Sequence, residues 1–83
     1  MTLKEKILLK GFKDVYIESP NDKEGNIEYC VIIYFDFIWN KDNRLDSGKQ
    51  EIEGDTEDEI MKNIDKFIET YSDKNDDWML KLI

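Results

Sequence analysis

The feature that most constrains the fold is an unbroken alternation of side chains over residues 27–39. Along this segment every second residue is apolar, whereas the residues between them are mixed in polarity. The apolar set is Ile27, Tyr29, Val31, Ile33, Phe35, Phe37 and Trp39, and the mixed set is Glu28, Cys30, Ile32, Tyr34, Asp36 and Ile38. Because successive side chains of a strand point to opposite faces, the pattern predicts a long strand with one buried face. Such a strand is typical of the middle of an antiparallel sheet.

Two shorter patterns precede this segment. Thr2 and Glu5 match a capping box, in which a hydroxyl and a carboxylate each accept a hydrogen bond from a free amide of the first helical turn. They predict a short helix over residues 3–10, which Gly11 ends. Alternation then predicts a strand over residues 12–18, followed by a polar loop.

Three further patterns follow the long alternating segment. Residues 49–53 alternate and predict a short strand after a turn-rich stretch. Thr56 and Glu59 match a second capping box, and apolar residues at three- and four-residue spacing predict an amphipathic helix over about 57–71. The apolar residues 78–83 fit either a last strand or a short helix, and we expect them to be docked on the domain.

These elements define a fold class. The chain has 83 residues, so we treat residues 1–83 as a single domain. Three consecutive strands joined by short loops predict an antiparallel meander, and the amphipathic helices are the available cover for its apolar face. We therefore expect a two-layer α+β fold, a three-stranded antiparallel meander covered by helices, in the order α-β-β-β-α with a short C-terminal element.

The charge of the chain is acidic and unevenly distributed. It has 20 Asp and Glu residues against 12 Lys and Arg, no histidine, and a net charge of −8. The first thirteen residues hold four lysines and one glutamate, a net charge of +3, so the remaining residues carry −11. Residues 51–59 hold six acids and no base. Such a charge repels nucleic acid, so we expect no direct nucleic-acid partner and look instead to basic protein surfaces or cations.

The residue types that carry most catalytic chemistry are scarce. Without histidine the lone Cys30 has no obvious base, and a single cysteine forms neither an internal disulfide nor a cysteine-based metal site. Because Cys30 lies in an apolar run, we interpret it as a small buried core residue. The acids from Asp42 onward resemble a calcium loop in spacing, but Arg44 stands where an oxygen ligand is required. We expect no metal, no cofactor and no enzymatic activity.

The apolar stretches are short. The longest, Tyr29 to Phe35, has seven residues and is too short to span a bilayer. No signal-peptide pattern is present, and one cysteine is typical of a reducing compartment. These features predict a cytoplasmic protein of the host cell that has no membrane partner.

The candidate site consists of acids from neighbouring elements, each able to take the place of a nucleic-acid phosphate opposite Lys or Arg. Trp39 is added because an exposed tryptophan surrounded by acid suits a protein-binding surface. The expected partner-binding residues are Asp36, Asp46, Glu51, Glu53, Asp55, Asp58 and Trp39. Part of this acid has a second explanation: residues 57–59 suit the start of a helix, and charges at Glu51 and Glu53 protect an edge strand from aggregation.

The size, the acidity and the element order together resemble those of small phage anti-CRISPR proteins, which block the DNA-entry groove of an RNA-guided nuclease. The resemblance runs through Leu3–Lys10, Lys13–Glu18, Ile27–Trp39, Lys49–Glu53 and Glu57–Tyr71. It implies binding to the groove that reads the short duplex motif beside the target, with carboxylates opposite its arginines.

Two other resemblances concern parts of the pattern. The segment from Gly54 into the second helix is similar to the helix entry of HicB-type antitoxins. The order helix, three strands, helix is similar to that of double-stranded-RNA-binding domains. Those domains need a basic helix start to meet phosphates, whereas this chain has acids at residues 57–59. The chain is therefore not expected to bind RNA.

The sequence thus predicts a small acidic inhibitor, encoded by a phage or mobile element, that mimics nucleic acid. Its expected partner is a basic nucleic-acid-binding protein, such as an RNA-guided nuclease. The alternative is an antitoxin-like or structural adaptor that binds through an apolar strand edge and an exposed tryptophan. The sequence leaves open whether the protein is a monomer or a homodimer.

Overall fold

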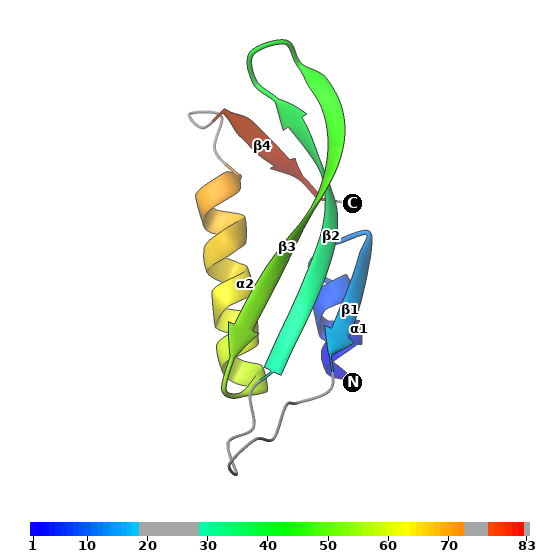
Figure 1. Ribbon diagram of the computed structural model, residues 1–83, viewed down its shortest axis with the longest axis vertical. Coiled ribbons are helices and arrows are strands. Elements are labelled where there is room, and N and C mark those ends of the chain that lie inside the picture. The colour runs from blue at the N-terminus through cyan, green and yellow to red at the C-terminus, as the bar shows by residue number, and fades with distance from the viewer. Residues whose placement is uncertain (19–28, 73–76, 83) are drawn as a thin grey trace.

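The computed structural model describes residues 1–18, 29–72 and 77–82. The predicted α+β fold and element order are confirmed, and the C-terminal element is a strand (Figure 1). Residues 27 and 28 of the predicted long strand, the loop before them, and residue 83 lie outside the described residues. The elements are α1 (Leu3–Leu8), β1 (Asp14–Glu18), β2 (Tyr29–Trp39), β3 (Arg44–Gly54), α2 (Glu57–Tyr71) and β4 (Trp78–Lys81).

The alternating segment forms β2, which is the central strand of the sheet. Along one edge β2 pairs over its full length with β3, from Tyr29 opposite Gly54 to Trp39 opposite Arg44. The other edge is shared end to end by β1, opposite residues 30–34, and β4, opposite residues 36–39. All of these pairings are antiparallel. The meander therefore gains a fourth strand, because β4 extends the edge that the shorter β1 leaves open.

Strand β3 is longer than the sequence predicts. The expected strand covered residues 49–53, whereas β3 begins at Arg44. Pairing with β2 uses main-chain groups, so residues 44–48, which are polar apart from Leu45 and Gly48, join the sheet without an alternating apolar pattern. Asn43 closes the short loop between the strands at a φ of 55°, a conformation that asparagine adopts more readily than most residues.

The two helix starts are built differently. At α1 the capping box is confirmed, because Thr2 Oγ1 accepts a hydrogen bond from the Glu5 amide and Glu5 accepts one from the Thr2 amide. At α2 the Thr56 hydroxyl accepts from the Glu59 amide at 3.1 Å, but Glu59 Oε2 accepts from the amide of Asp55 at 2.7 Å. The second box is therefore only half formed, and its carboxylate ties α2 to the end of β3. Helix α1 ends two residues earlier than expected.

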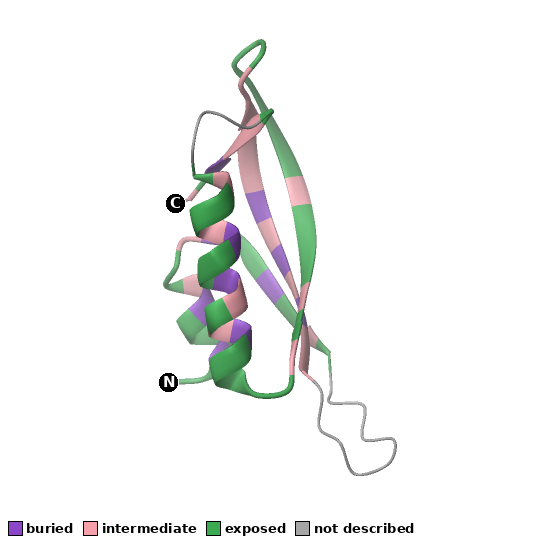
Figure 2. Ribbon diagram, turned by 90° about the vertical axis from the view of Figure 1, so that its left-hand side faces the viewer, coloured by how far each residue is buried: buried purple, intermediate pink, exposed green. Residues whose placement is uncertain are grey.

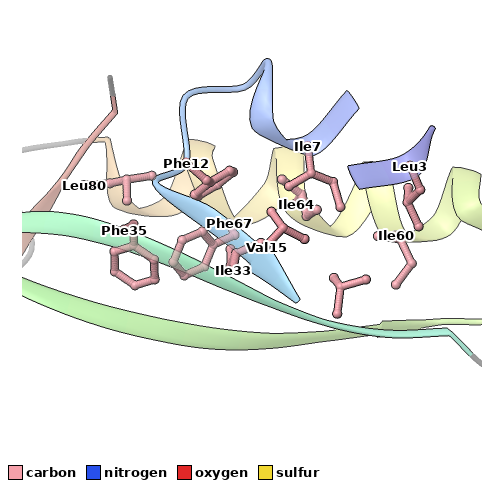
Figure 3. Packing of buried hydrophobic residues seen from close by; sticks show 11 residues of the cluster. Leu3, Ile7, Phe12, Val15, Ile33, Phe35, Ile60, Ile64, Phe67 and Leu80 are labelled. Carbon is pink, nitrogen blue, oxygen red and sulfur yellow. The ribbon is translucent and has the colours of Figure 1, made fainter. Parts of the chain in front are cut away.

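Both helices lie on one side of the sheet, and the side chains between the two layers form the core (Figure 2). Figure 3 shows these side chains directed toward one another from the sheet and the helices. Among the described residues, every buried side chain in this core is hydrophobic. The core consists of Leu3, Ile7, Phe12, Val15, Val31, Ile33, Phe35, Ile60, Ile64, Phe67 and Leu80.

Aromatic rings extend the core toward the β2–β3 hairpin. Trp78 of β4 stacks on Tyr71 of α2, with ring centroids 4.2 Å apart and planes 7° apart. Its ring also lies 5.8 Å from Phe35 and 5.0 Å from Phe37. Opposite these rings Gly48 leaves the necessary room, because a Cβ there would lie 3.1 Å from a ring carbon of Phe37. These contacts dock the C-terminal strand, as its apolar sequence predicts.

The two faces of β2 provide a matched test of this architecture. Ile33 is fully buried under the helices, whereas its neighbour Ile32 points to the other side and is half-buried. We expect Ile33→Ala to lower the free energy of unfolding by about 2–5 kcal/mol. Ile32→Ala should cost about 1 kcal/mol, because it removes only partly buried surface. Urea denaturation of both variants measures the difference, and equal losses would contradict the assignment of the faces.

Candidate functional site

The side of the sheet away from the helices, here called the open face, is ordered in rows across three strands. Directly opposite residues of antiparallel strands share a face, so the pairing fixes each row. From the end of β3 toward the hairpin, the rows are Glu18–Cys30–Glu53, Tyr16–Ile32–Glu51, Asp14–Tyr34–Lys49, Lys81–Asp36–Ser47 and Met79–Ile38–Leu45. The first two rows contain three acids and no base, and the fifth row is wholly apolar.

The acids of the first two rows, Glu18, Glu51 and Glu53, surround Cys30 and are here called the acidic patch. All three side chains are exposed, whereas Cys30 is half-buried. The thiol of Cys30 donates a hydrogen bond to Glu51 Oε1 at 3.2 Å. The sulfur and the carboxylate oxygens of Glu51 and Glu53 lie within 4.8 Å of one another. Several negative charges are therefore concentrated at one end of the open face.

The surroundings of Cys30 raise the pKa of its thiol. Partial burial, the hydrogen bond to Glu51 and the negative charges of Glu51, Glu18 and Glu53 raise the pKa of its thiol to about 12, from an ordinary value of 9.0. The interpretation of Cys30 as a buried core residue is wrong, because the alternation along β2 places it on the open face. Its raised pKa keeps it protonated at neutral pH, so it is a poor nucleophile.

Among the described residues, Cys30, Glu51 and Glu53 lie close enough together to hold a metal ion. A thiol with two carboxylates is a possible donor set for Zn²⁺. The thiol must lose its proton to bind a metal, and the neighbouring carboxylates hold that proton in place. We therefore describe this region by its charge.

Two of the expected site acids lie elsewhere and are already engaged. Asp36 accepts hydrogen bonds from the Ser47 hydroxyl at 2.8 Å and from Lys13 Nζ at 3.2 Å, and both lower the pKa of its carboxyl. Asp46 lies on the helix side of β3, where it accepts a hydrogen bond from the indole of Trp39 at 3.1 Å. This bond and one from the Ser47 amide lower the pKa of Asp46. Asp46 and Trp39 lie together on the hairpin, away from the acidic patch.

The other two expected acids lie at the start of α2. Asp55 and Asp58 line a shallow hollow of about 390 Å³ together with Tyr29, Thr56 and Glu57. This hollow adjoins the end of β3, so its acids lie at the same end of the molecule as the acidic patch (Figure 1). The structure thus brings Glu51, Glu53, Asp55 and Asp58 to one end and adds Glu18, which the expected set omitted.

The outer edge of β3 is partly closed by side chains. The backbone N–H and C=O groups of successive residues point to alternate edges of a strand. On β2 the carbonyl of Tyr34 points to β1, so the odd-numbered residues of β2 point to β3, where their partners are even-numbered. The backbone groups of the odd-numbered β3 residues therefore point outward. Three of their backbone groups have side-chain partners: the amide of Ser47 with Asp46, and the carbonyls of Glu51 and Glu53 with Gln50 and Asn63. Such capping opposes the addition of another strand at this edge.

Comparison of the chain with protein-family models, curated proteins and solved structures finds no match. Within the described part of the chain, neither helix is long and apolar enough to cross a membrane.

The protonated state of Cys30 can be measured by alkylation. Because only the thiolate reacts, we expect iodoacetamide at pH 8 to modify the folded protein at least about tenfold more slowly than the urea-unfolded chain. Glu51→Gln should accelerate the reaction, since it removes an anionic acceptor. Equal rates for folded and unfolded chains would contradict the raised pKa.

The same shift predicts a pH dependence of stability. Between about pH 9 and pH 12 the thiol ionises in the unfolded chain but not in the folded one. The stability that Cys30 contributes is therefore complete below pH 9 and lost as the pH rises through this interval. Comparing the alkaline unfolding of the wild type with that of Cys30→Ser isolates this contribution from those of lysine and tyrosine. Parallel stability curves would contradict it.

Proposed function

We propose that the protein is a small non-enzymatic inhibitor that mimics nucleic acid and occupies a basic DNA-binding site of a partner protein. In the preferred form the chain comes from a phage or mobile element and the partner is a host defence nuclease, as the resemblance to anti-CRISPR proteins implies. The observation that carries the proposal is the acidic patch around Cys30, whose combined field helps to hold the pKa of that thiol at about 12.

The arrangement of these acids suits recognition by lysine and arginine. Glu51 and Glu53 are two residues apart on β3, about 6.7 Å between their Cα atoms. Their carboxylate oxygens lie within 4.8 Å of one another, and Glu18 approaches from β1 across Cys30. The acids at the start of α2 extend the charge around the same end. Exposed negative charges on a rigid frame are the property through which basic proteins hold a nucleic-acid backbone. Steering by such a field accelerates association with a basic surface.

The adaptor alternative has less support. Addition of a partner strand requires open backbone groups, and side chains of Asp46, Gln50 and Asn63 occupy three of those on β3. The indole N–H of Trp39 donates to Asp46, so this tryptophan is held by its own chain.

A charge-reversal pair tests the proposal. The wild-type chain is immobilised and exposed at low salt to the heparin-binding fraction of a bacterial lysate. We expect it to retain a nucleic-acid-binding protein that moderate salt or a short DNA duplex releases. Glu51→Lys with Glu53→Lys should reduce retention about tenfold or more, because two attractions become repulsions.

The matched control is Glu69→Lys with Asp77→Lys. This pair changes the net charge equally but lies at the end of α2 and the start of β4, away from the acidic patch. It should retain the partner as the wild type does. Retention that neither DNA nor the Glu51 and Glu53 reversals reduce would contradict the proposal.

A further inference from the structure

The open face has an apolar part that the acidic patch does not explain. The second and third rows present Tyr16, Ile32 and Tyr34, and the fifth row adds three apolar side chains. The polar fourth row lies between them, and the opposite charges of the third and fourth rows balance within each row. Tyr16 is 57% exposed and Leu45 is 56% exposed. Both helices lie on the other side of the sheet, and no described segment covers this one (Figure 2). The apolar side chains are Tyr16, Ile32, Tyr34, Ile38, Leu45 and Met79.

We propose that the open face binds an amphipathic helix of the partner protein, with lysine or arginine at one end and apolar side chains toward the other. This inference rests on the proposed function, because the basic end of that helix meets the acidic patch. It adds that the partner supplies a helix and that apolar contacts contribute to binding. The charge gradient along the rows sets the direction: the basic end lies over Glu18, Glu51 and Glu53, and the apolar end lies over Ile38.

The sheet favours a helix as the occupant. Side-chain caps close parts of the β3 edge, and on β1 the amide of Val15 donates to Asp14, so the addition of a strand is opposed at these points. A sheet face is instead covered efficiently by a helix, as α1 and α2 cover the other side. The first and fifth rows are eight residues apart along β2, about 27 Å. A helix of about 18 residues spans this length.

The charge pattern argues against a second copy of this chain as the occupant. A two-fold axis lying in the open face along the strands would place each acidic patch against its own copy, where like charges repel. An axis across the strands would place Glu18 and Glu53 against the apolar fifth row, where carboxylates lose solvation without gaining a partner. A basic partner avoids both penalties.

The probe is a synthetic 18-residue helical peptide with three lysines at one end of its contact face and leucines along the rest. Its control is an isomer of the same composition whose leucines are scattered around the helix. We expect the amphipathic peptide to bind the intact protein with a dissociation constant at least about tenfold lower than that of the isomer. Amide shifts in NMR should map the contact to the strands of the sheet, Met79 of β4 included, and leave α1 and α2 unchanged.

Variants separate the two parts of the surface. Tyr16→Thr with Ile38→Thr replaces both apolar side chains by threonine, which also favours strands, and should weaken binding of the amphipathic peptide about tenfold. Leu9→Thr, at the end of α1, removes an apolar side chain that is 72% exposed on the other side and should have no effect. Glu51→Lys with Glu53→Lys should weaken binding of both peptides.

The outcomes distinguish this inference from the proposed function. If both peptides bind equally and only the glutamate reversals matter, the acidic site stands and the helix-docking inference is overturned. If the reversals also have no effect, both fail. A wild-type NMR footprint on α1 or α2 overturns the inference even if the Tyr16 and Ile38 variant does not fold.

Discussion

The inner face of β2 has to be covered, and the rest of the molecule is arranged around this requirement. Val31 and Ile33 are fully buried and Phe35 nearly so, and together they contact both helices and the flanking strands through one apolar core. The core is small, so both helices are needed on the same side. The consequence is an asymmetric sheet, covered on one face and uncovered by any described segment on the other. In such a sheet the side chains that alternate with the core residues are available for binding.

The alternation along β2 places core residues on one face and the residues of the proposed binding surface on the other. Ile33 stabilises the fold while Ile32 lies on the open face, and Cys30 lies among carboxylates because Val31 points to the core. Partial burial of Cys30, its hydrogen bond to Glu51 and the charges of Glu51, Glu18 and Glu53 together raise the pKa of the thiol. Other acids are neutralised by near neighbours, as Lys13 does for Asp36 and Lys10 for Asp65. The clustering of Glu18, Glu51 and Glu53 around Cys30 is the strongest reason to propose a function for this end of the sheet.

Local patterns predicted much of the fold. The period of two in β2 and the three- and four-residue spacing in α2 come from residues close in sequence, so they are readable without a structure. The full length of β3 was not predicted, because its first half has only Leu45 as a large apolar residue and is held by backbone pairing with β2. The side of the sheet on which Asp46 lies depends on the register of the β2–β3 hairpin. Glu18 and Glu53 come close because each pairs with Cys30 of β2 from opposite edges, which the sequence of either strand does not reveal. Cys30 was misplaced because a general preference of cysteine for cores outweighed the alternation, which was the better guide.

The acidic patch should concentrate negative potential at one end of the open face. Solvent paramagnetic relaxation in NMR, compared between a cationic and an anionic nitroxide, measures the local potential near each amide. We expect the most negative values around residues 16–18, 30–32 and 51–53, and weaker ones along the outward side of α2, where Lys62 and Lys66 alternate with acids. A uniform potential, or a minimum on the helical side, would contradict it.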